Sequence, residues 1–214
     1  MAIKFYVNLN TCGRLIHHMA ARKVKKNCAA EEQDESNDIY RENNHVYFYT
    51  DIDRTTISQL NVLLRQGEEF CIIMRRRLQL DSVPLYLHIY SEGGEIYSAF
   101  AAMDLIQSLT VPVYSVIEGA TASAGTLISM ICEKRFIRPL GYMLIHQLSS
   151  ACWGKMSEIT DEYHNLKDMM KTVRDLYLQY TKLSSKKLDE LLRHDLWLDA
   201  KQSIAYGLVD ELYT

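Results

Sequence analysis

Two kinds of apolar pattern alternate along much of the chain, and this alternation limits the fold more than any other feature. In the segment 84–90, PLYLHIY, leucine or isoleucine alternates with tyrosine or histidine, which is the two-residue period of a β-strand. The segment 95–109 spaces its apolar residues by three and four, as in a helix, and VPVYSVI over 111–117 reads as the next strand. Strands that alternate with helices predict an α/β fold.

The remaining regular segments continue this pattern. We expect strands over 46–52, 135–138 and 142–146, and helices over 55–78, 123–133, 184–194 and 200–206. Thr55 and Thr56 are the expected caps of the first helix, and Gly67 is the place where that helix could bend or break. The helix that begins at Ser123 is apolar over much of its circumference, which predicts that it is buried.

A longer helix is predicted over 155–181, where one apolar stripe continues without interruption. At about 1.5 Å per residue it would be about 40 Å long, which exceeds what the core of a small domain needs. We therefore expect it to project and to pack on another subunit, although it could also lie along its own domain. The stripe consists of Met156, Ile159, Tyr163, Leu166, Met170, Val173, Tyr177 and Tyr180.

Composition excludes several classes of partner and compartment. With 214 residues, of which 48% are hydrophobic, the chain can form one compact domain with a substantial core, or such a domain with a small appendage. The formal net charge of -3 favours neither a nucleic acid nor a membrane surface as partner. Five irregularly spaced cysteines without a CxxC pair predict neither a disulfide framework nor a zinc site. Since this cysteine pattern favours a reducing compartment and no apolar run approaches about 18 residues, the expected compartment is the cytoplasm or an equivalent reducing one.

The segment 20–44 is polar and carries a basic run, RKVKK at 22–26, followed by an acidic run, EEQDE at 31–35. A solvated loop is one interpretation of these charges, and a docking or pore-lining element is the other.

Ser123, in the segment GATASAGT, is the candidate nucleophile. Small neighbours permit a tight turn and the approach of a substrate, and the start of a helix favours an alkoxide-like oxygen. The N–H of Ala124 would point toward the same oxygen. An ordinary N-cap serine remains an alternative, because the segment has Thr121 where a GxSxG motif has its first glycine.

Three other places could complete an acyl-transfer site. The double glycine of SEGGEI, at 91–96, could present N–H groups to an oxyanion or simply form a tight turn; nucleotide-binding glycine motifs are lacking. His146 ends an apolar strand and is the candidate base, whereas His88 is interpreted as a structural histidine within its strand and His45 as a surface residue. Asp195 could orient the base or cap the following turn.

Four of these segments resemble, in order and spacing, those of Clp protease proteolytic subunits, the ClpP family. They are SEGG, GATASAGTLIS, GYMLIHQ and HDLWLDAKQSIAYGLVDEL; DIYRENNHVYFYTDI is also similar, so the resemblance extends over Asp38–Thr214. It implies a triad of Ser123 as nucleophile, His146 as general base and acid, and Asp195 as the group that orients the imidazole. It further implies an oxyanion hole from the backbone N–H groups of Gly94 and Ala124, with no cofactor and no metal.

The same resemblance implies an architecture. The fold would be a crotonase-like ββα superhelix head, formed by 38–147 and 184–214, with a long projecting handle helix in the segment 148–183 and a divergent N-terminal segment over 1–37. The sequence departs from the family at Glu92 and Leu148, where proline is common, and in the segments 149–154 and 75–84.

It also implies a function: the proteolytic subunit of an ATP-dependent protease, a serine endopeptidase that hydrolyses unfolded polypeptides and peptides through an acyl-enzyme. The chamber would be a homo-oligomer of two stacked heptameric rings, a tetradecamer, fed by a ring-shaped AAA+ unfoldase. A crotonase-like acyl-CoA enzyme and a non-catalytic ring subunit are the alternatives.

Overall fold

A computed structural model describes residues 38–214, so the charged runs at 22–26 and 31–35 lie outside the described residues. The strands are β1 (Ile39–Glu42), β2 (His45–Phe48), β3 (Leu85–Ser91), β4 (Val113–Ala122), β5 (Lys134–Ile137), β6 (Tyr142–Leu144), β7 (Leu198–Asp199) and β8 (Glu211–Leu212). The helices are α1 (Arg54–Leu78), α2 (Ile96–Ser108), α3 (Ala124–Met130), α4 (Met156–Tyr180), α5 (Ser185–Leu191) and α6 (Ala200–Ala205).

The strands form one mixed sheet, ordered β1-β2-β3-β4-β5-β8, with β6 paired to the second half of β4 and β7 paired to β6. Neighbours from β2 to β8 along this order run parallel, and β1 forms an antiparallel pair with β2. Strand β6 runs parallel to β4 and antiparallel to β7. The predicted α/β fold is therefore confirmed.

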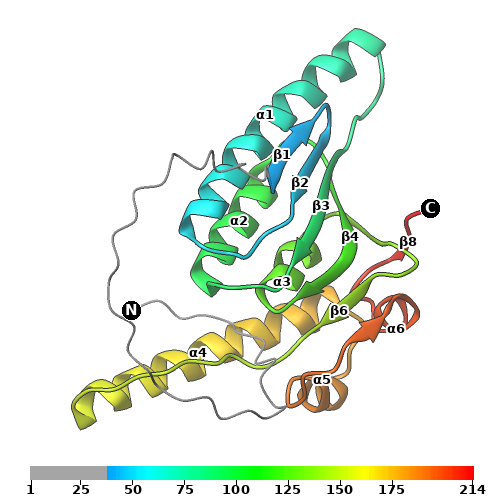
Figure 1. Cartoon of the computed structure of the whole chain (residues 1–214). Coiled ribbons are helices and arrows are strands. Elements are labelled where there is room, and N and C mark those ends of the chain that lie inside the picture. Colours follow the sequence, from blue (N-terminus) through cyan, green and yellow to red (C-terminus); the bar gives the residue numbers. More distant parts are fainter. Residues whose placement is uncertain (1–37) are drawn as a thin grey trace, which may run out of the picture. The chain divides into compact units, whose positions relative to one another are not determined.

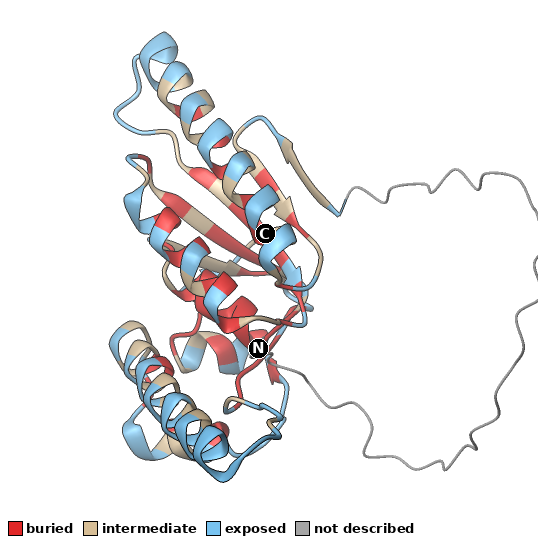
Figure 2. Ribbon diagram, turned by 90° about the vertical axis from the view of Figure 1, so that its left-hand side faces the viewer, coloured by how far each residue is buried: buried red, intermediate tan, exposed pale blue. Residues whose placement is uncertain are grey.

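Three helices cover one face of this sheet. Helices α1 and α2 contact each other, α2 contacts α3, and both α1 and α3 contact the strands directly (Figure 1). Buried residues concentrate on the strands and on the helix surfaces that face them (Figure 2). Val46, Leu60, Leu87, Ile117 and Leu127 are among the fully buried members of this core. The apolar patterns of the sequence thus mark the surfaces that pack.

Helix α1 corrects two expectations. Its cap is Asp53, whose carboxylate accepts hydrogen bonds from the N–H groups of Thr55 and Thr56 at 2.7 and 2.8 Å. Thr56 completes a capping box by accepting from the Asp53 N–H. Gly67 neither breaks nor ends the helix; a Cβ there would lie 2.5 Å from Leu85 Cδ1, so glycine allows the helix to approach β3 closely.

Strand β4 is longer than predicted and helix α3 is shorter. The strand continues through Gly119, at a φ of 61°, to Ala122. The helix was expected to reach Glu133, but the N–H of that residue donates to the carbonyl of Val113 at 2.9 Å and so returns the chain to the sheet. Tertiary hydrogen bonds, which periodicity does not reveal, set both boundaries.

The long helix predicted over 155–181 is α4, and only part of its apolar stripe is covered. Val173 and Tyr177 are buried, whereas Met156 is 80% exposed and Tyr163 is 61% exposed. Much of the surface of α4 is exposed (Figure 2). Within residues 38–214, no helix has both the length and the apolarity needed to cross a membrane.

The cap of α1 can be tested with Asp53→Ala. Loss of a side-chain N-cap should lower the free energy of unfolding by about 1 kcal/mol. Urea unfolding followed by circular dichroism measures the change. Asp51→Ala is the matched control, because Asp51 contributes only its backbone carbonyl to this turn. Equal stability of the two variants would contradict the assigned cap.

Candidate active site

Ser123 occupies a sharp turn between β4 and α3. Its φ is 56° and its ψ is -124°, a conformation that non-glycine residues rarely adopt. Its N–H donates to the carbonyl of Leu144 at 2.8 Å, and its carbonyl accepts from the N–H and the hydroxyl of Thr126 at 3.0 and 2.7 Å. This strained strand-to-helix turn resembles a nucleophile elbow in geometry, although its sequence lacks the GxSxG motif.

The double glycine of the loop after β3 lies against this turn. A Cβ on Gly93, at a φ of 102°, would lie 2.7 Å from Ser123 Cβ and 3.1 Å from the backbone nitrogen of Ala124. A Cβ on Gly94, at a φ of 144°, would lie 2.0 Å from the carbonyl oxygen of Ile52. Both positions therefore require glycine. The close approach of Gly93 to Ser123 was missed from the sequence, where the Gly-Gly pair was the only signal.

A buried hydrogen bond joins the serine helix to α4. The hydroxyl groups of Thr126 and Tyr177 lie 2.6 Å apart, and both residues are buried. Thr126 thus links Ser123 to α4 through side-chain bonds. Tyr177 was expected only as part of an apolar stripe, because periodicity does not identify the partner of a hydroxyl.

His146 lies two residues beyond β6 and is 5% exposed. Strands β4 and β6 are adjacent and parallel, and the Ser123 N–H donates to the carbonyl of Leu144 at the end of β6. Ser123 and His146 therefore both follow the carboxyl ends of adjacent parallel strands. The next residue, Gln147, donates its N–H to the carbonyl of Leu192 at 2.9 Å, which fixes this segment to the end of α5.

Asp195 follows α5 and approaches the same imidazole. The distance from His146 Nδ1 to Asp195 Oδ1 is 3.9 Å, and the Asp195 side chain is 56% exposed. This distance permits electrostatic attraction but exceeds a hydrogen bond. Ser123 Oγ is buried and makes no hydrogen bond within residues 38–214. Ser123 and His146 thus follow neighbouring strands and Asp195 lies near the imidazole, but Ser123 Oγ makes no hydrogen bond to the imidazole and the contact with Asp195 is longer than a hydrogen bond.

Burial lowers the pKa of His146 below its usual value of 6.5, and this effect outweighs the opposing effects of the Asp195 carboxylate and a backbone hydrogen bond near Gln147. The imidazole is consequently neutral at neutral pH. A neutral imidazole can accept a proton, which is the property a general base needs.

His88 has a structural role, as its position in the strand indicated. Its Nδ1 lies 2.7 Å from a carboxylate oxygen of Glu118, and its Nε2 lies 2.8 Å from His45 Nδ1. His45 was expected to be a surface residue, but it is half-buried and stacks on Tyr86. Within residues 38–214, no group of three or more His, Cys, Asp or Glu side chains could hold a metal ion.

Known proteins share this sequence and this fold. Residues 72–214 match the family model described as Clp protease. The ATP-dependent Clp protease proteolytic subunit 2 of Treponema denticola is 34% identical over 146 residues, which cover 65% of this chain and 73% of the relative. The protein of the same name from Treponema pallidum is 32% identical over 146 residues, which again cover 65% of this chain and 73% of the relative.

A solved structure, the ClpP1 N165D mutant from Listeria monocytogenes, superimposes with a TM-score of 0.66 at 24% identity, covering 77% of this chain and 88% of that one. This likeness confirms the crotonase-like fold. Because the family model covers well over half of the sequence, the chain belongs to the Clp protease family, a family of serine-type endopeptidases that act as the proteolytic subunits of ATP-dependent proteases.

Proposed function

We propose that this chain cleaves peptide bonds through an acyl-enzyme on Ser123. The observation that carries the proposal is the strained conformation of Ser123, at a φ of 56°, on a turn that also brings it to the His146 segment. Non-glycine residues in such conformations concentrate at functional sites, where the surrounding structure holds them in place.

The roles of the side chains follow from their chemistry. Ser123 Oγ attacks the scissile carbonyl while His146 accepts the hydroxyl proton, and Asp195 orients the imidazolium that forms. The oxyanion accepts hydrogen bonds from the N–H groups of Gly94 and Ala124. His146 then gives its proton to the leaving amine, and a water molecule hydrolyses the acyl-serine by the reverse sequence of transfers.

The long separation between His146 and Asp195 is compatible with the mechanism. A hydrogen bond from His146 to Asp195 requires the separation of 3.9 Å to shorten by about 1 Å. Catalytic hydrogen bonds are often long in a substrate-free enzyme and shorten in the complex. The exposed loop that carries Asp195 can move over such a distance without repacking the core.

Membership of the Clp protease family implies oligomerisation and association with Clp ATPases. We propose that the oligomer is two stacked heptameric rings of this chain, fed by a ring-shaped AAA+ unfoldase, and that the segment 148–183 is the handle that joins the rings. Exposed apolar side chains support the handle: Trp153 is 87% exposed and Met156 is 80% exposed.

The head would be 38–147 and 184–214, with 1–37 as a sequence-divergent N-terminal segment. A cytoplasmic or equivalent reducing location is supported by three cysteines of the described region that are not in disulfides, namely Cys71, Cys132 and Cys152.

One alternative has a specific observation in its favour. The bond from Ser123 Oγ to the imidazole is not formed, as would also be found in a ring subunit that lacks activity of its own. Covalent labelling separates the two functions, because an inactive subunit would not react with a fluorophosphonate.

The nucleophile is tested by Ser123→Ala in the full chain. A fluorophosphonate should modify the wild-type chain once, at Ser123 in a peptide map, and Ser123→Ala should not be modified. Undiminished labelling of Ser123→Ala would exclude the assignment. Asp195→Asn should slow labelling by up to about 10⁴-fold, since the imidazole loses its orienting carboxylate. Asp104→Asn, an exposed carboxylate on α2, is the matched control and should react at the wild-type rate.

The pH dependence of labelling tests the base. Only neutral His146 accepts a proton, so the rate constant should fall as the pH drops through its pKa, which burial places below 6.5. The Asp195 carboxylate raises this pKa, so Asp195→Asn should move the acid limb of the profile to still lower pH. A limb above pH 6.5 in the wild type, or a shift of the opposite sign, would argue against His146 as the base.

A further inference from the structure

The carbonyl of Ser123 and the N–H of Ala124 belong to one peptide unit. This unit is trans and planar, so its carbonyl and its N–H point in opposite directions and rotate together. Thr126 holds the carbonyl with two hydrogen bonds, one from its N–H at 3.0 Å and one from its hydroxyl at 2.7 Å. Because the Ala124 N–H is a proposed oxyanion donor, a contact that fixes this carbonyl also aims that donor.

A second hydroxyl group continues this series of hydrogen bonds. Tyr177 Oη lies 2.6 Å from Thr126 Oγ1. A carbonyl oxygen can only accept, so the single hydroxyl hydrogen of Thr126 is used on Ser123 and Tyr177 is the donor of the second bond. In the opposite arrangement the Tyr177 hydrogen would have no acceptor among residues 38–214, and an unpaired buried hydroxyl is costly. The hydrogen bonds therefore run from Tyr177 to Thr126 and from Thr126 to the Ser123 carbonyl.

The burial of Tyr177 indicates that its hydroxyl does more than fill space. Tyr177 is 1% exposed and, with Val173, is one of the residues of α4 that are buried. A phenylalanine would fill nearly the same volume without the cost of burying a hydroxyl. Burial raises the pKa of Tyr177, so the hydroxyl keeps its proton and remains a donor. Hydrogen bonds in series polarise one another, so the bond from Tyr177 strengthens the bond from Thr126 to Ser123.

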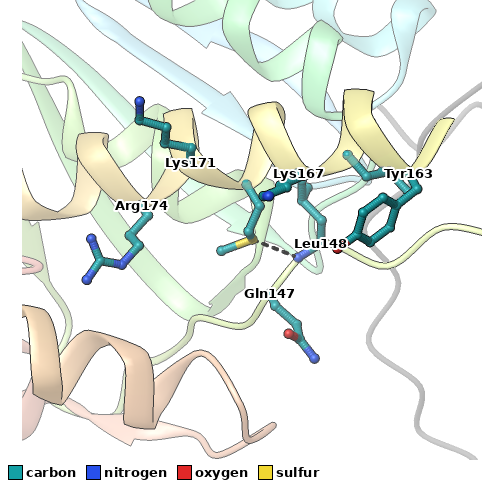
Figure 3. A pocket seen from close by; sticks show the side chains of 8 residues that line it. Gln147, Leu148, Tyr163, Lys167, Lys171 and Arg174 are labelled. Atoms are coloured by element: carbon teal, nitrogen blue, oxygen red, sulfur yellow. Dashed lines mark hydrogen bonds between the residues drawn. The ribbon is translucent and has the colours of Figure 1, made fainter. Parts of the chain in front are cut away.

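Helix α4 also contacts the segment that follows His146. The N–H of Leu148 donates to the sulfur of Met170 at 3.4 Å, the bond drawn as a dashed line beside Leu148 in Figure 3. Met170 and Tyr177 are seven residues apart, which places them on the same face of the helix. A substitution that displaced α4 would therefore disturb the His146 segment as well as the Ser123 turn. A test of the Tyr177 hydroxyl must for this reason keep the volume of the side chain.

We propose that Tyr177 is a positioning residue for the oxyanion hole. Its hydroxyl fixes Thr126, Thr126 fixes the Ser123 carbonyl, and the planar peptide unit then aims the Ala124 N–H at the oxyanion. These hydrogen bonds act in the transition state, where charge develops on that oxygen, and they leave the base unchanged. This inference rests on the proposed function of Ser123 and assigns a part in it to a residue of α4.

The test measures the second-order rate constant for fluorophosphonate labelling of the full chain, followed by intact mass. Ser123 Oγ bonds to phosphorus, fluoride leaves, and the serine proton passes to His146, while negative charge develops on the phosphoryl oxygen. Tyr177→Phe should react about 3- to 10-fold more slowly than the wild type, the rate equivalent of one neutral hydrogen bond. Tyr180→Phe is the matched control on α4 and should react at the wild-type rate, because its hydroxyl accepts from Gln107 on α2 at 3.3 Å.

A double variant separates positioning from stability. Thr126→Val removes the bond to the Ser123 carbonyl and leaves the Tyr177 hydroxyl buried without an acceptor, which should lower the melting temperature by about 5 °C. Combining Thr126→Val with Tyr177→Phe leaves neither hydroxyl in place, so most of this loss of stability should be recovered. The labelling rate of the double variant should nevertheless stay about 3- to 10-fold below that of the wild type. Thr126→Ser keeps the hydroxyl and should label at close to the wild-type rate.

The outcomes separate the role of Tyr177 from that of Ser123. In Tyr177→Phe the acid limb of the pH profile should keep its wild-type midpoint, because His146 is unchanged. A wild-type rate in Tyr177→Phe, a rate that recovers with the melting temperature in the double variant, or a displaced acid limb overturns the role of Tyr177, while labelling at Ser123 upholds the nucleophile. If the wild-type chain is not labelled at Ser123, the proposed function fails and this inference fails with it.

Discussion

Strand β4 changes its neighbour halfway along its length, and the arrangement of the candidate active site depends on this change. Residues 114–117 pair with β5, whereas residues 120–122 pair with β6. Between them, Gly119 adopts a φ of 61° and the register with β3 shifts. Since β4 and β6 run parallel, the residues that follow them, Ser123 and His146, come to the same edge of the sheet. Ligand sites of α/β folds generally lie at the carboxyl ends of the strands.

The conformation of Ser123 is costly and is held by its surroundings. A residue in such a region costs about 1 to 3 kcal/mol, which must be offset elsewhere in the fold. Its backbone N–H and carbonyl are both bonded, to Leu144 and Thr126, and every residue of α3 is buried. The glycines at 93 and 94 let a second loop approach without a clash. The turn is therefore fixed by contacts from β6, α3 and the loop after β3, none of which the local segment GATASAGT specifies alone.

Sequence patterns predicted the type of every long element, because burial of one face imposes a period of two or 3.6 on the apolar residues. They also selected Ser123, His146 and Asp195, although only the order of four segments favoured Ser123 as a nucleophile over an N-cap. The sequence patterns failed where contacts outside the pattern determine the role of a residue. The cap of α1 is Asp53 and not Thr55 or Thr56. Gly67 packs against Leu85, and His45 lies within hydrogen-bond distance of His88. In each case the partner is distant in sequence or the choice depends on backbone geometry.

In the proposed mechanism Asp195 orients His146 and raises its basicity. At 3.9 Å, and with more than half of its side chain exposed, the carboxylate acts on the imidazole through solvent-weakened attraction, and burial of the imidazole prevails in lowering its pKa. A hydrogen bond between the two would fix the ring and at the same time raise its affinity for the serine proton. If the proposed mechanism holds, a displacement of about 1 Å would complete the geometry and also strengthen the base, so that orientation and proton affinity would change together.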